Sequence, residues 1–483
     1  MNLEELRTKR IGILGFSKNN HEVTAWLLRH GAEHVTVLDE GAVEWRAGQQ
    51  NDSPSTDPSL HGAKWKFSPD AFANLPDYDV LIRTPGVRLS RPEIQAAKAA
   101  GVEISSQTKL FFEYCPALII GVTGTKGKGT TCSLIAAMQE ANTGLSGKAY
   151  LAGNIGLDPF AFLDQLTAED RVILELSSFQ LQDLDRSPHV AVVLGITSDH
   201  LDYHANRGEY VDAKTAIVRF QRESDFAVVN ADSPSSASFA QITKGQVWET
   251  SSTREVDRGA FVRWTGSEPN VRTGEVVLRS AGGQDVVLVR TTELQLRGEH
   301  NLENVMAAAV GAHLSGVPIP TIQSVLRTFA GYKHRLQKVG EVNGVVCYED
   351  SAATAPEPAI AAVKSFNEPI HLIVGGSSKG WDFSEFGQVI AESTVASVIP
   401  LGTAEAPKIV AAVEASRKGE SPIITDTANS MDEAFQAALN LAKPGDVILL
   451  SPAAPGFDLF KNYADRGDQF IACVKQAEAK HVA

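Results

Sequence analysis

The chain has 483 residues, of which 43% are hydrophobic and 21% are charged, a balance typical of a folded protein with about two to four domains. Its 44 basic and 58 acidic residues give a net charge of −14, which disfavours nucleic acid and anionic membrane surfaces as partners. The 4 cysteines are scattered and form no C-x-x-C pair, which suits a reducing compartment. No apolar run approaches the ~20 residues of a membrane helix, so we expect a cytoplasmic protein without membrane insertion.

The N-terminal part of the chain predicts a β-α-β unit. Apolar residues at 10–15 and at 35–38 indicate two strands around a helical segment, and Asp39 ends the second strand. A dinucleotide site would need G-x-G-x-x-G, but only the first glycine, Gly15, is present. A hydride-transferring enzyme is therefore disfavoured, and we expect this fold to hold another ligand or to act as a scaffold. A further strand over 78–83 precedes Thr84-Pro-Gly86.

An apolar run over 118–123 leads into a turn rich in glycine and lysine and then into a helix-forming segment. This order is typical of a phosphate-binding loop, in which Gly124 and Gly127 let backbone amides approach a phosphate chain and Lys128 reaches its end. Gly129 stands where a Ser or Thr normally holds Mg²⁺, so the nearest hydroxyl is that of Thr130. We expect nucleotide binding here; the alternative is a strand-to-helix connection without a ligand.

Two further features of the central region indicate a site. Glu175 ends a buried apolar strand, the place where nucleotide-hydrolysing folds carry an acid linked to a metal, although it could also be a capping carboxylate. Four residues crowd the stretch after the next strand, and such a cluster is commonly a site for a metal or for catalysis: Asp199, His200, Asp202 and His204. The sequence over 232–297 has no regular pattern, which indicates an insertion or a peripheral sheet.

The C-terminal part repeats an α/β pattern, with apolar strands over 345–350, 370–376, 397–402 and 447–451. Ligands are expected at the carboxyl ends of such strands, where Asp350, Lys379 and the loop 451–458 fall. The predicted fold class is α/β with three domains. They are a Rossmann-like N-terminal domain over residues 1–108, a central P-loop ATPase-type domain over 109–331 and a Rossmann-like, doubly wound C-terminal domain over 332–483.

Several motifs occur in one order along the chain: VTGTKGK, GNIG, ELSSFQL, ITSDHLDYH, HNLENV, HRL, GGSSKGWDF and SPAAPGFDLFKNYADRGD. Together they resemble the Mur ligase family from about residue 10 to residue 475, and within it the members that add glutamate. The resemblance implies an ATP-dependent ligase of peptidoglycan precursor synthesis. The segment TKGKGTT also resembles the folylpolyglutamate synthases, which are kept as an alternative.

The same resemblance implies three small-molecule partners, which are ATP, UDP-N-acetylmuramoyl-L-alanine and glutamate, and a monomeric enzyme. D-glutamate is the favoured amino acid, and an L-glutamate-adding variant of the family is the first alternative. A folylpolyglutamate synthase would act on folate instead, and a nucleotide-binding regulator or inactive paralogue would bind ATP with little turnover. In the family, the substrate carboxylate takes the γ-phosphoryl group of ATP to give an acyl phosphate, which the amine of the amino acid then attacks.

The resemblance also implies roles for individual residues. The catalytic residues would be Lys128, Glu175, His200 and Lys214. Two Mg²⁺ ions would be held by Thr130, Glu175, His200 and Lys214, with Lys214 carbamylated. ATP would be bound by Gly124, Thr125, Lys126, Gly127, Lys128, Gly129, Thr130, Thr131, Asn154, Asn301, Asn304, Arg335 and Asp350.

The two remaining substrates have residue sets of their own in the resemblance. The UDP substrate would be bound by Gly15, Phe16, Ser17, Asp39, Pro85, Gly86, Asn154 and Ser177. The amino acid would be bound by Thr354, Lys379, Gly456, Phe457 and Tyr463. This chain departs from the family at Gly456, where the family has a serine, and at Ala352, where a second lysine is common. We therefore expect an altered pocket for the side-chain carboxylate of glutamate.

Overall fold

The computed structural model describes residues 3–16, 18–40, 57–155, 157–197, 206–265, 273–296, 298, 300–331, 334–378, 381–417, 419 and 421–482. The chain forms two compact units, which are described separately below. The first unit comprises Met1–Thr292 and Leu302–Val325, and the second comprises Glu293–Asn301 and Leu326–Ala483. Within the described residues, no helix combines the length and the apolar character needed to cross a membrane.

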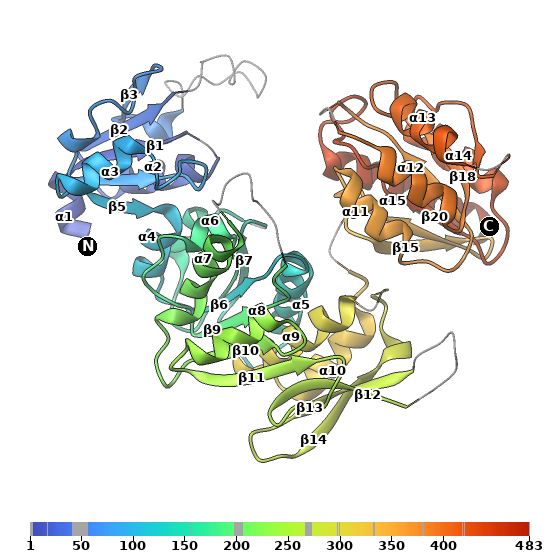
Figure 1. Cartoon of the computed structure of the whole chain (residues 1–483), viewed down its shortest axis with the longest axis horizontal. Helices are drawn as coiled ribbons and strands as arrows, with labels where there is room; N and C mark the ends of the chain where they lie inside the picture. The colour runs from blue at the N-terminus through green and yellow to red at the C-terminus, as the bar shows by residue number, and fades with distance from the viewer. Residues whose placement is uncertain are drawn as a thin grey trace. The chain divides into compact units, whose positions relative to one another are not determined.

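The first sheet of the first unit has parallel strands in the order β3-β2-β1-β4-β5 (Figure 1). Its strands are β1 (Arg10–Leu14), β2 (His34–Asp39), β3 (Lys64–Phe67), β4 (Val80–Arg83) and β5 (Glu103–Ser106), and its helices are α1 (Leu3–Thr8), α2 (Lys18–Arg29), α3 (Pro92–Ala99) and α4 (Gln107–Tyr114). Side chains of α1, α2 and α4 join one apolar cluster of the sheet and those of α3 join another, so β1 and β4 are apolar almost throughout. The strand order changes direction between β1 and β4, which is where parallel sheets bind ligands.

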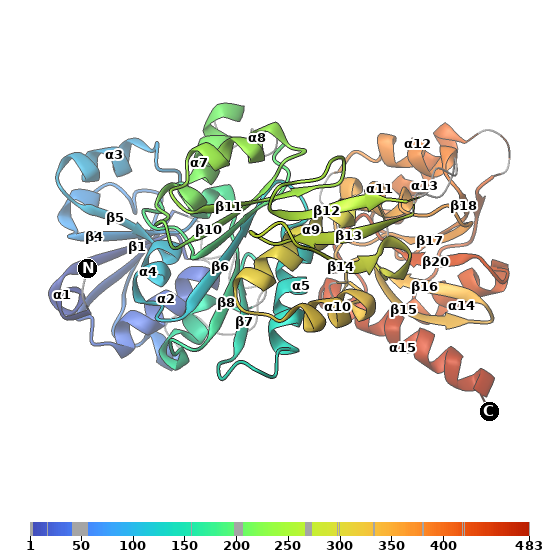
Figure 2. The same ribbon diagram turned by 90° about the horizontal axis from the view of Figure 1, so that it is seen from below.

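The second sheet of the first unit has the strand order β14-β13-β12-β11-β10-β9-β6-β8-β7 (Figure 2). Its strands are β6 (Leu118–Thr123), β7 (Ala149–Gly153), β8 (Arg171–Glu175), β9 (Val190–Val193), β10 (Phe226–Asn230), β11 (Gln246–Ser251), β12 (Gly259–Trp264), β13 (Gly274–Arg279) and β14 (Asp285–Arg290). The helices of this region are α5 (Lys128–Glu140), α6 (Ser178–Leu181), α7 (Arg207–Arg219), α8 (Pro234–Ala237), α9 (His300–Leu314) and α10 (Ile319–Thr328). Strand β6, which feeds the glycine-rich turn, lies between β9 and β8.

The segment 232–297, expected to be an insertion or a peripheral sheet, continues the second sheet. Strands β11 and β12 extend it in parallel, and β13 and β14 close its edge as antiparallel strands. The outermost strand, β14, buries only part of its residues, so its pattern is weaker than that of a strand covered on both faces. The segment is therefore the edge of the main sheet.

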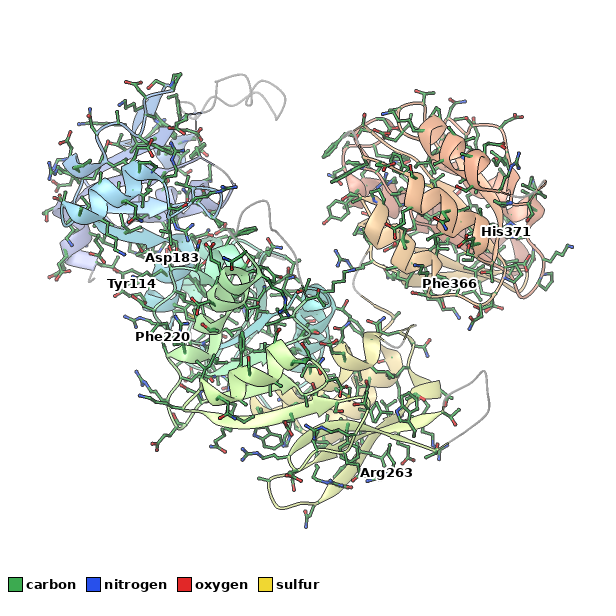
Figure 3. All side chains as sticks on the ribbon, in the orientation of Figure 1. Tyr114, Asp183, Phe220, Arg263, Phe366 and His371 are labelled. Carbon is green, nitrogen blue, oxygen red and sulfur yellow. The ribbon has the colours of Figure 1, made fainter. Side chains whose placement is uncertain are left out.

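The two sheets of the first unit share one apolar core. A single cluster of buried side chains includes members from both sheets, from Leu6 in α1 to Phe239. Trp26 of α2 packs against Tyr114 and Phe160, with ring centroids 5.1 and 5.2 Å apart, and its Nε1 donates to Oδ1 of Asp164 at 2.8 Å. Figure 3 marks Tyr114 at this junction. Burial of aromatic surface thus holds the first sheet to the second.

The second unit is a doubly wound sheet in the order β15-β16-β20-β17-β18-β19, in which only β15 and β16 run antiparallel. Its strands are β15 (Gln337–Val342), β16 (Val345–Glu349), β17 (Ile370–Val374), β18 (Val395–Pro400), β19 (Ile423–Ile424) and β20 (Val447–Leu450). Its helices are α11 (Pro356–Val363), α12 (Ser384–Glu392), α13 (Ala406–Ser416), α14 (Met431–Leu441) and α15 (Tyr463–Val482). Helices α11, α12 and α13 pack in one apolar cluster, and α14 and α15 pack in another, so both faces are covered. The α/β fold class predicted from the sequence is confirmed.

The change Leu449→Ala should lower the free energy of unfolding by about 2–5 kcal/mol, because it empties a buried position in the middle of the second unit's sheet. Urea unfolding followed by circular dichroism would measure the loss. The matched control is Ile423→Ala on the edge strand β19, where the side chain is 54% exposed and the cost should stay below about 1 kcal/mol. Equal losses in the two variants would contradict this assignment of core and edge.

Candidate active site

The turn between β6 and α5 is packed too closely for side chains at its glycines. Gly124 has a φ of +153°, and a Cβ there would lie 2.7 Å from Cβ of Leu194. Gly127 is the N-cap of α5 in the left-handed region, with φ +82°, and a Cβ there would lie 2.1 Å from Oδ1 of Asn304. The first amides of a helix have no intrahelical acceptor, and Gly127 offers them no side-chain cap. The turn therefore has the form of a phosphate-binding loop.

Lys128 and Thr125 fix the charge and the shape of this loop. The Nζ atom of Lys128 donates to the carbonyl oxygens of Gly124 at 3.1 Å and of Thr125 at 3.0 Å, so the ammonium group stays at the turn. The amide of Thr125 donates to the carbonyl oxygen of Gly195 at 2.9 Å, and its hydroxyl accepts from the amide of Thr197 at 2.9 Å. The loop is thus anchored to the end of β9, and its lysine is placed for a polyanion.

A carboxylate lies beside the first turn of α5. Glu175 ends β8 and is 5% exposed, and its Oε2 lies 3.3 Å from the point that a Cβ on Gly129 would occupy. Nδ2 of Asn154 donates to its Oε1 at 3.1 Å. Carboxylate oxygens next to a phosphate loop are the donors that Mg²⁺ uses, and Thr130 lies half-buried one residue further along the helix. The glycine at 129 leaves room for this carboxylate, so the residues fit a nucleotide phosphate with its magnesium ion.

Lys214 is buried directly behind the loop. It lies on α7 with 1% of its surface exposed, and its Nζ donates to the carbonyl oxygen of Gly124 at 3.1 Å and to Oγ1 of Thr123 at 3.3 Å. The same nitrogen lies 4.7 Å from the centre of the Tyr210 ring. Lys214 is therefore held against the end of β6 and the start of the loop, and its carbamylation stays a prediction.

Asn304 connects α9 to the loop. It is 4% exposed, its Oδ1 accepts from Oγ1 of Thr131 at 3.3 Å, and the same atom is the one that a Cβ on Gly127 would meet. This asparagine therefore supports the start of α5 from behind. Asn301, one turn earlier in α9, is 7% exposed.

Some predicted site residues fall outside the described part of the chain. They are Ser17, Asp199, His200, Asp202, His204 and Lys379. Among the residues that the structure does describe, no group of three or more His, Cys, Asp and Glu side chains is placed to hold a metal ion. Of the predicted metal ligands, Thr130, Glu175 and Lys214 are described, and each lies on an element that borders the loop.

The residues predicted to bind the UDP substrate gather at the carboxyl edge of the first sheet. Gly15 follows β1 with φ +77°, and a Cβ there would lie 2.8 Å from Oγ1 of Thr84. The amide of Phe16 donates to Oδ2 of Asp39, at the end of β2, at 2.7 Å. Gly86 is in an exposed turn after β4, next to Pro85. The turns after β1 and β4 thus lie side by side, at the change in strand order.

Ser177 begins α6 in the second sheet as its N-cap. Its hydroxyl accepts from the amide of Gln180 at 3.3 Å, and the side chain of Gln180 accepts in return from the amide of Ser177 at 2.9 Å. This capping box explains why a helix starts inside the motif ELSSFQL. It fixes Ser177 at the carboxyl end of the strand that carries Glu175.

In the second unit, one buried guanidinium ties together the loops at the carboxyl edge of the sheet. Arg466 is 0% exposed, and its three nitrogens donate to Ser351, Gly375 and Ala454 at 2.7–3.2 Å. These acceptors follow β16, β17 and β20. Burial lowers the pKa of Arg466 to about 10. A Cβ on Gly456 would lie 3.3 Å from Cζ of Arg466, so this glycine sits directly on the guanidinium.

Asp350 is a second buried group at the same edge. It is 4% exposed, Oγ of Ser451 donates to its Oδ2 at 2.7 Å, and the amide of Leu336 donates to its Oδ1 at 3.0 Å. Burial raises the pKa of Asp350 to about 7. Arg335, the residue before Leu336, is exposed. Its positive charge lowers the pKa of Asp350 and so opposes the effect of burial.

The residues predicted to hold the amino acid differ in exposure. Phe457 is 65% exposed, and Tyr463, the first residue of α15, is 41% exposed. Thr354 is half-buried after β16, and its amide donates to the carbonyl oxygen of Ala352 at 2.9 Å. Gly456 lies in the loop after β20. It follows Ala454 in the chain and precedes both aromatic residues. The described part of this site is therefore an open loop edge above the Arg466 guanidinium.

Sequence reasoning missed three residues that organise these edges: Arg83, Asp183 and Arg466. Arg83 gave one usable signal, because a charged residue that closes an apolar strand must find a buried partner. Arg466 gave none, because it lies in the polar first turn of α15 and most of its acceptors are backbone carbonyls of loops in other parts of the sheet edge.

Comparison with known proteins gives the family. The model of the Mur ligase middle domain matches residues 122–312, and that of the Mur ligase glutamate ligase domain matches residues 334–454. A UDP-N-acetylmuramoylalanine--D-glutamate ligase of Acetivibrio thermocellus is 35% identical over 479 residues, covering 99% of this chain and 98% of the relative. A protein of the same name from Symbiobacterium thermophilum is 36% identical, covering 97% of this chain and 98% of the relative.

Solved structures agree at the level of the fold. The UDP-N-acetylmuramate-alanine ligase of Thermotoga maritima aligns with a TM-score of 0.57 at 17% identity, covering 97% of this chain and all of the other. MurF of Acinetobacter baumannii aligns with a TM-score of 0.55 at 17% identity, covering 98% of this chain and 92% of the other. The chain belongs to the Mur ligase family, a class of ATP-dependent ligases, as its motifs predicted.

The change Asp350→Asn should flatten the pH dependence of stability. The folded chain binds the Asp350 proton with a pKa of about 7, against a usual value of 3.8, so the folded state holds this proton more tightly than the unfolded chain. Stability from this group is therefore full below about pH 4 and is lost as the pH rises to about 7. Relative to the wild type, the variant should therefore gain stability as the pH rises from about 4 to about 7, with no further gain above that, in urea-unfolding measurements.

The matched control for this titration is Asp382→Asn. Asp382 is exposed, and a hydrogen bond from Ser384 lowers its pKa below 3.8, so its removal should leave the difference from the wild type constant over the same pH range. A constant difference for Asp350→Asn as well would contradict the raised pKa.

Proposed function

We propose that the chain is an ATP-dependent ligase that joins D-glutamate to the L-alanyl carboxylate of UDP-N-acetylmuramoyl-L-alanine, a step of peptidoglycan precursor synthesis in the cytoplasm. The observation that carries the proposal is the closely packed, glycine-rich loop before α5, with Lys128, Glu175 and Lys214 around it. Relatives that align over nearly the whole chain and are named D-glutamate ligases support the choice of substrates.

The loop over 124–131 is assigned to the phosphates of ATP. Its amides and Lys128 would hold the phosphate oxygens, because both place positive charge at the turn where the phosphate chain would lie. Thr130, Glu175, His200 and a carbamate on Lys214 would hold Mg²⁺, which when bound neutralises charge on the phosphates. Asn154 would reach the same phosphates, because its amide group already touches Glu175.

The reaction that this site would serve has two steps. The L-alanyl carboxylate oxygen attacks the γ-phosphorus of ATP, an acyl phosphate forms, and ADP leaves. The amine of glutamate then attacks the acyl carbon, the amide bond forms, and inorganic phosphate leaves. The contribution of the chain is to bring anionic groups together in line and to offset their charge, since a net charge of −14 would otherwise repel them.

The UDP substrate is assigned to the carboxyl edge of the first sheet, at Gly15, Phe16, Ser17, Asp39, Pro85 and Gly86. Support comes from the contact between the turns after β1 and β4 at the change in strand order, where open parallel sheets bind nucleotides. Ser177 and Asn154 lie on the second sheet of the same unit and would hold the end of this substrate that reacts. Asn301 and Asn304 are assigned to the adenine side of ATP, and Arg335 and Asp350 are assigned to ATP as groups from the C-terminal part of the chain.

Glutamate is assigned to Thr354, Lys379, Gly456, Phe457 and Tyr463. The serine that the family resemblance implies is missing at Gly456, where a Cβ would lie 3.3 Å from Cζ of Arg466. Loss of one hydroxyl partner would cost a carboxylate roughly 1–3 kcal/mol unless backbone amides replace it. This altered pocket keeps L-glutamate as the alternative substrate, and the names of the relatives favour D-glutamate.

Phosphate release tests the proposal directly. The full chain with ATP, Mg²⁺ and UDP-N-acetylmuramoyl-L-alanine should release phosphate with D-glutamate and much less with L-glutamate, neutral or basic amino acids, and a folate substrate should give none. Lys128→Ala is the control for ATP dependence and should lose at least about a hundredfold in rate, because the phosphate charge loses its partner. Turnover with folate alone would assign the chain to the folylpolyglutamate synthases, and ATP binding without turnover would identify a regulator.

The change Lys214→Ala should remove most of the activity, because the site loses either an anionic metal ligand or a buried contact to the loop. If the lysine carries a carbamate, added acetate or bicarbonate should restore part of the rate by supplying the missing oxygen ligands. The matched control is Lys109→Ala, which removes an exposed pair with Asp185 and should leave the rate unchanged. Full activity of Lys214→Ala would contradict any role of this lysine in the site.

A further inference from the structure

Arg83 is a fully buried charge at the end of β4. Its side chain is 0% exposed, and its Nε donates to Oδ2 of Asp183 at 2.9 Å. Its Nη1 donates to the carbonyl oxygen of Val87 at 3.1 Å, and its Nη2 donates to the carbonyl oxygen of Phe179 at 3.2 Å. All three nitrogens of the guanidinium are therefore engaged, and their acceptors belong to both sheets of the first unit.

Asp183 receives this guanidinium from the side of the second sheet. It follows α6, and its other oxygen, Oδ1, accepts from Oγ of Ser106 at 3.2 Å. Arg83 and Ser106 are register partners at the carboxyl ends of β4 and β5. One carboxylate from the second sheet thus holds the ends of two adjacent strands of the first sheet, and Figure 3 marks Asp183 beside α6.

Stability alone gives little reason for such a pair. Taking both charges out of water costs several kcal/mol, and apolar residues of similar size often stabilise a fold equally well or better. The first unit already has an extensive apolar core that joins its two sheets. A buried ion pair with these four hydrogen bonds offers something that apolar packing lacks, which is a fixed direction and distance between the backbone segments that it connects.

Those segments carry the residues assigned to the UDP substrate. Val87 closes the turn that contains Pro85 and Gly86, and the same turn contacts Gly15 through Thr84. Phe179 lies in α6, two residues after Ser177. Arg83 therefore connects two parts of the proposed UDP-substrate site through its hydrogen bonds to Val87 and Phe179. One part is the turn assigned to the nucleotide, and the other is the start of α6, assigned to the reactive end of the same molecule.

We propose that Arg83, held by Asp183, is a positioning residue for the UDP substrate: it fixes the turn 84–87 relative to the start of α6, so that one molecule can contact both. This inference rests on the proposed function, because it uses the residues assigned to that substrate. It predicts a defect confined to the UDP substrate, since the ATP loop and its supports make none of these contacts.

The test compares Arg83→Lys and Asp183→Asn with the wild type. Lysine keeps the charge but has a single nitrogen, which cannot serve Asp183, Val87 and Phe179 together. The KM for UDP-N-acetylmuramoyl-L-alanine should rise about tenfold in Arg83→Lys, and the Kd of the same compound, measured by calorimetry without ATP, should rise in parallel. The KM values for ATP and glutamate should stay within about twofold, and Asp183→Asn should shift the same parameters in the same direction.

The matched control is Arg91→Lys. Arg91 is also in the first unit, but its side chain is 30% exposed, and Glu40 and Glu93, with which it pairs, both belong to the region of the first sheet. This variant should leave all KM values unchanged. A lowered melting temperature in Arg83→Lys and Asp183→Asn with every KM and the Kd unchanged would overturn the proposal, because it would show a purely structural pair. An equal rise in the KM of all three substrates would overturn it as well.

Direct binding separates this inference from the proposed function. If the wild type binds the UDP compound but releases no phosphate with any amino acid, the proposed ligase reaction is wrong, and the comparison of Kd values still decides the role of Arg83. If the wild type turns over normally and the variants keep its Kd, the positioning role is wrong and the proposed function stands. If the wild type does not bind the UDP compound, both are overturned.

Discussion

The turn from β6 to α5 has no room for a side chain at Gly124 or Gly127, and the surrounding elements of the first unit pack closely against it. Three glycines each face a different neighbour: Gly124 faces Leu194 after β9, Gly127 faces Asn304 on α9, and Gly129 faces Glu175 at the end of β8. The loop is therefore in contact with elements from both sides of its own strand and from a helix much later in the chain. Backbone amides can approach a phosphate group here because the space that side chains would take is already filled from behind.

Both units use a buried arginine at the carboxyl edge of a parallel sheet. Arg83 in the first unit and Arg466 in the second are each 0% exposed, and each donates to backbone carbonyls of loops that follow different strands. Loops at such an edge leave carbonyl groups without partners in the sheet, and a guanidinium can satisfy several of them at fixed angles. Burying the charge costs free energy, but it makes the edge of the sheet rigid. A site assembled from several loops requires such rigidity.

The acidic balance of the chain makes local positive charge decisive. A net charge of −14 repels the anionic substrates assigned to it, so attraction must come from a few groups close to the ligand. At the loop these are the amides at the start of α5 and the ammonium group of Lys128. Glu175 adds negative charge at the same place, which is favourable only with a cation between it and the phosphates. The amides of the loop, Lys128 and Glu175 together therefore suit a phosphate chain with a magnesium ion bound to it.

The sequence by itself determined the α/β class, the phosphate-type loop and the family, because glycine spacing, strand periodicity and motif order are local properties that survive without knowledge of contacts. The α/β class and the family are confirmed, while the phosphate loop and the roles of individual site residues stay predictions. Only the tertiary structure decided that 232–297 continues the main sheet, that Gly456 rests on Arg466, and that Arg83 meets Asp183. The physical reason is separation along the chain: Arg83 and Asp183 are 100 residues apart and Arg466 and Ser351 are 115 apart, and nothing in the local pattern around any of them identifies the partner that burial imposes.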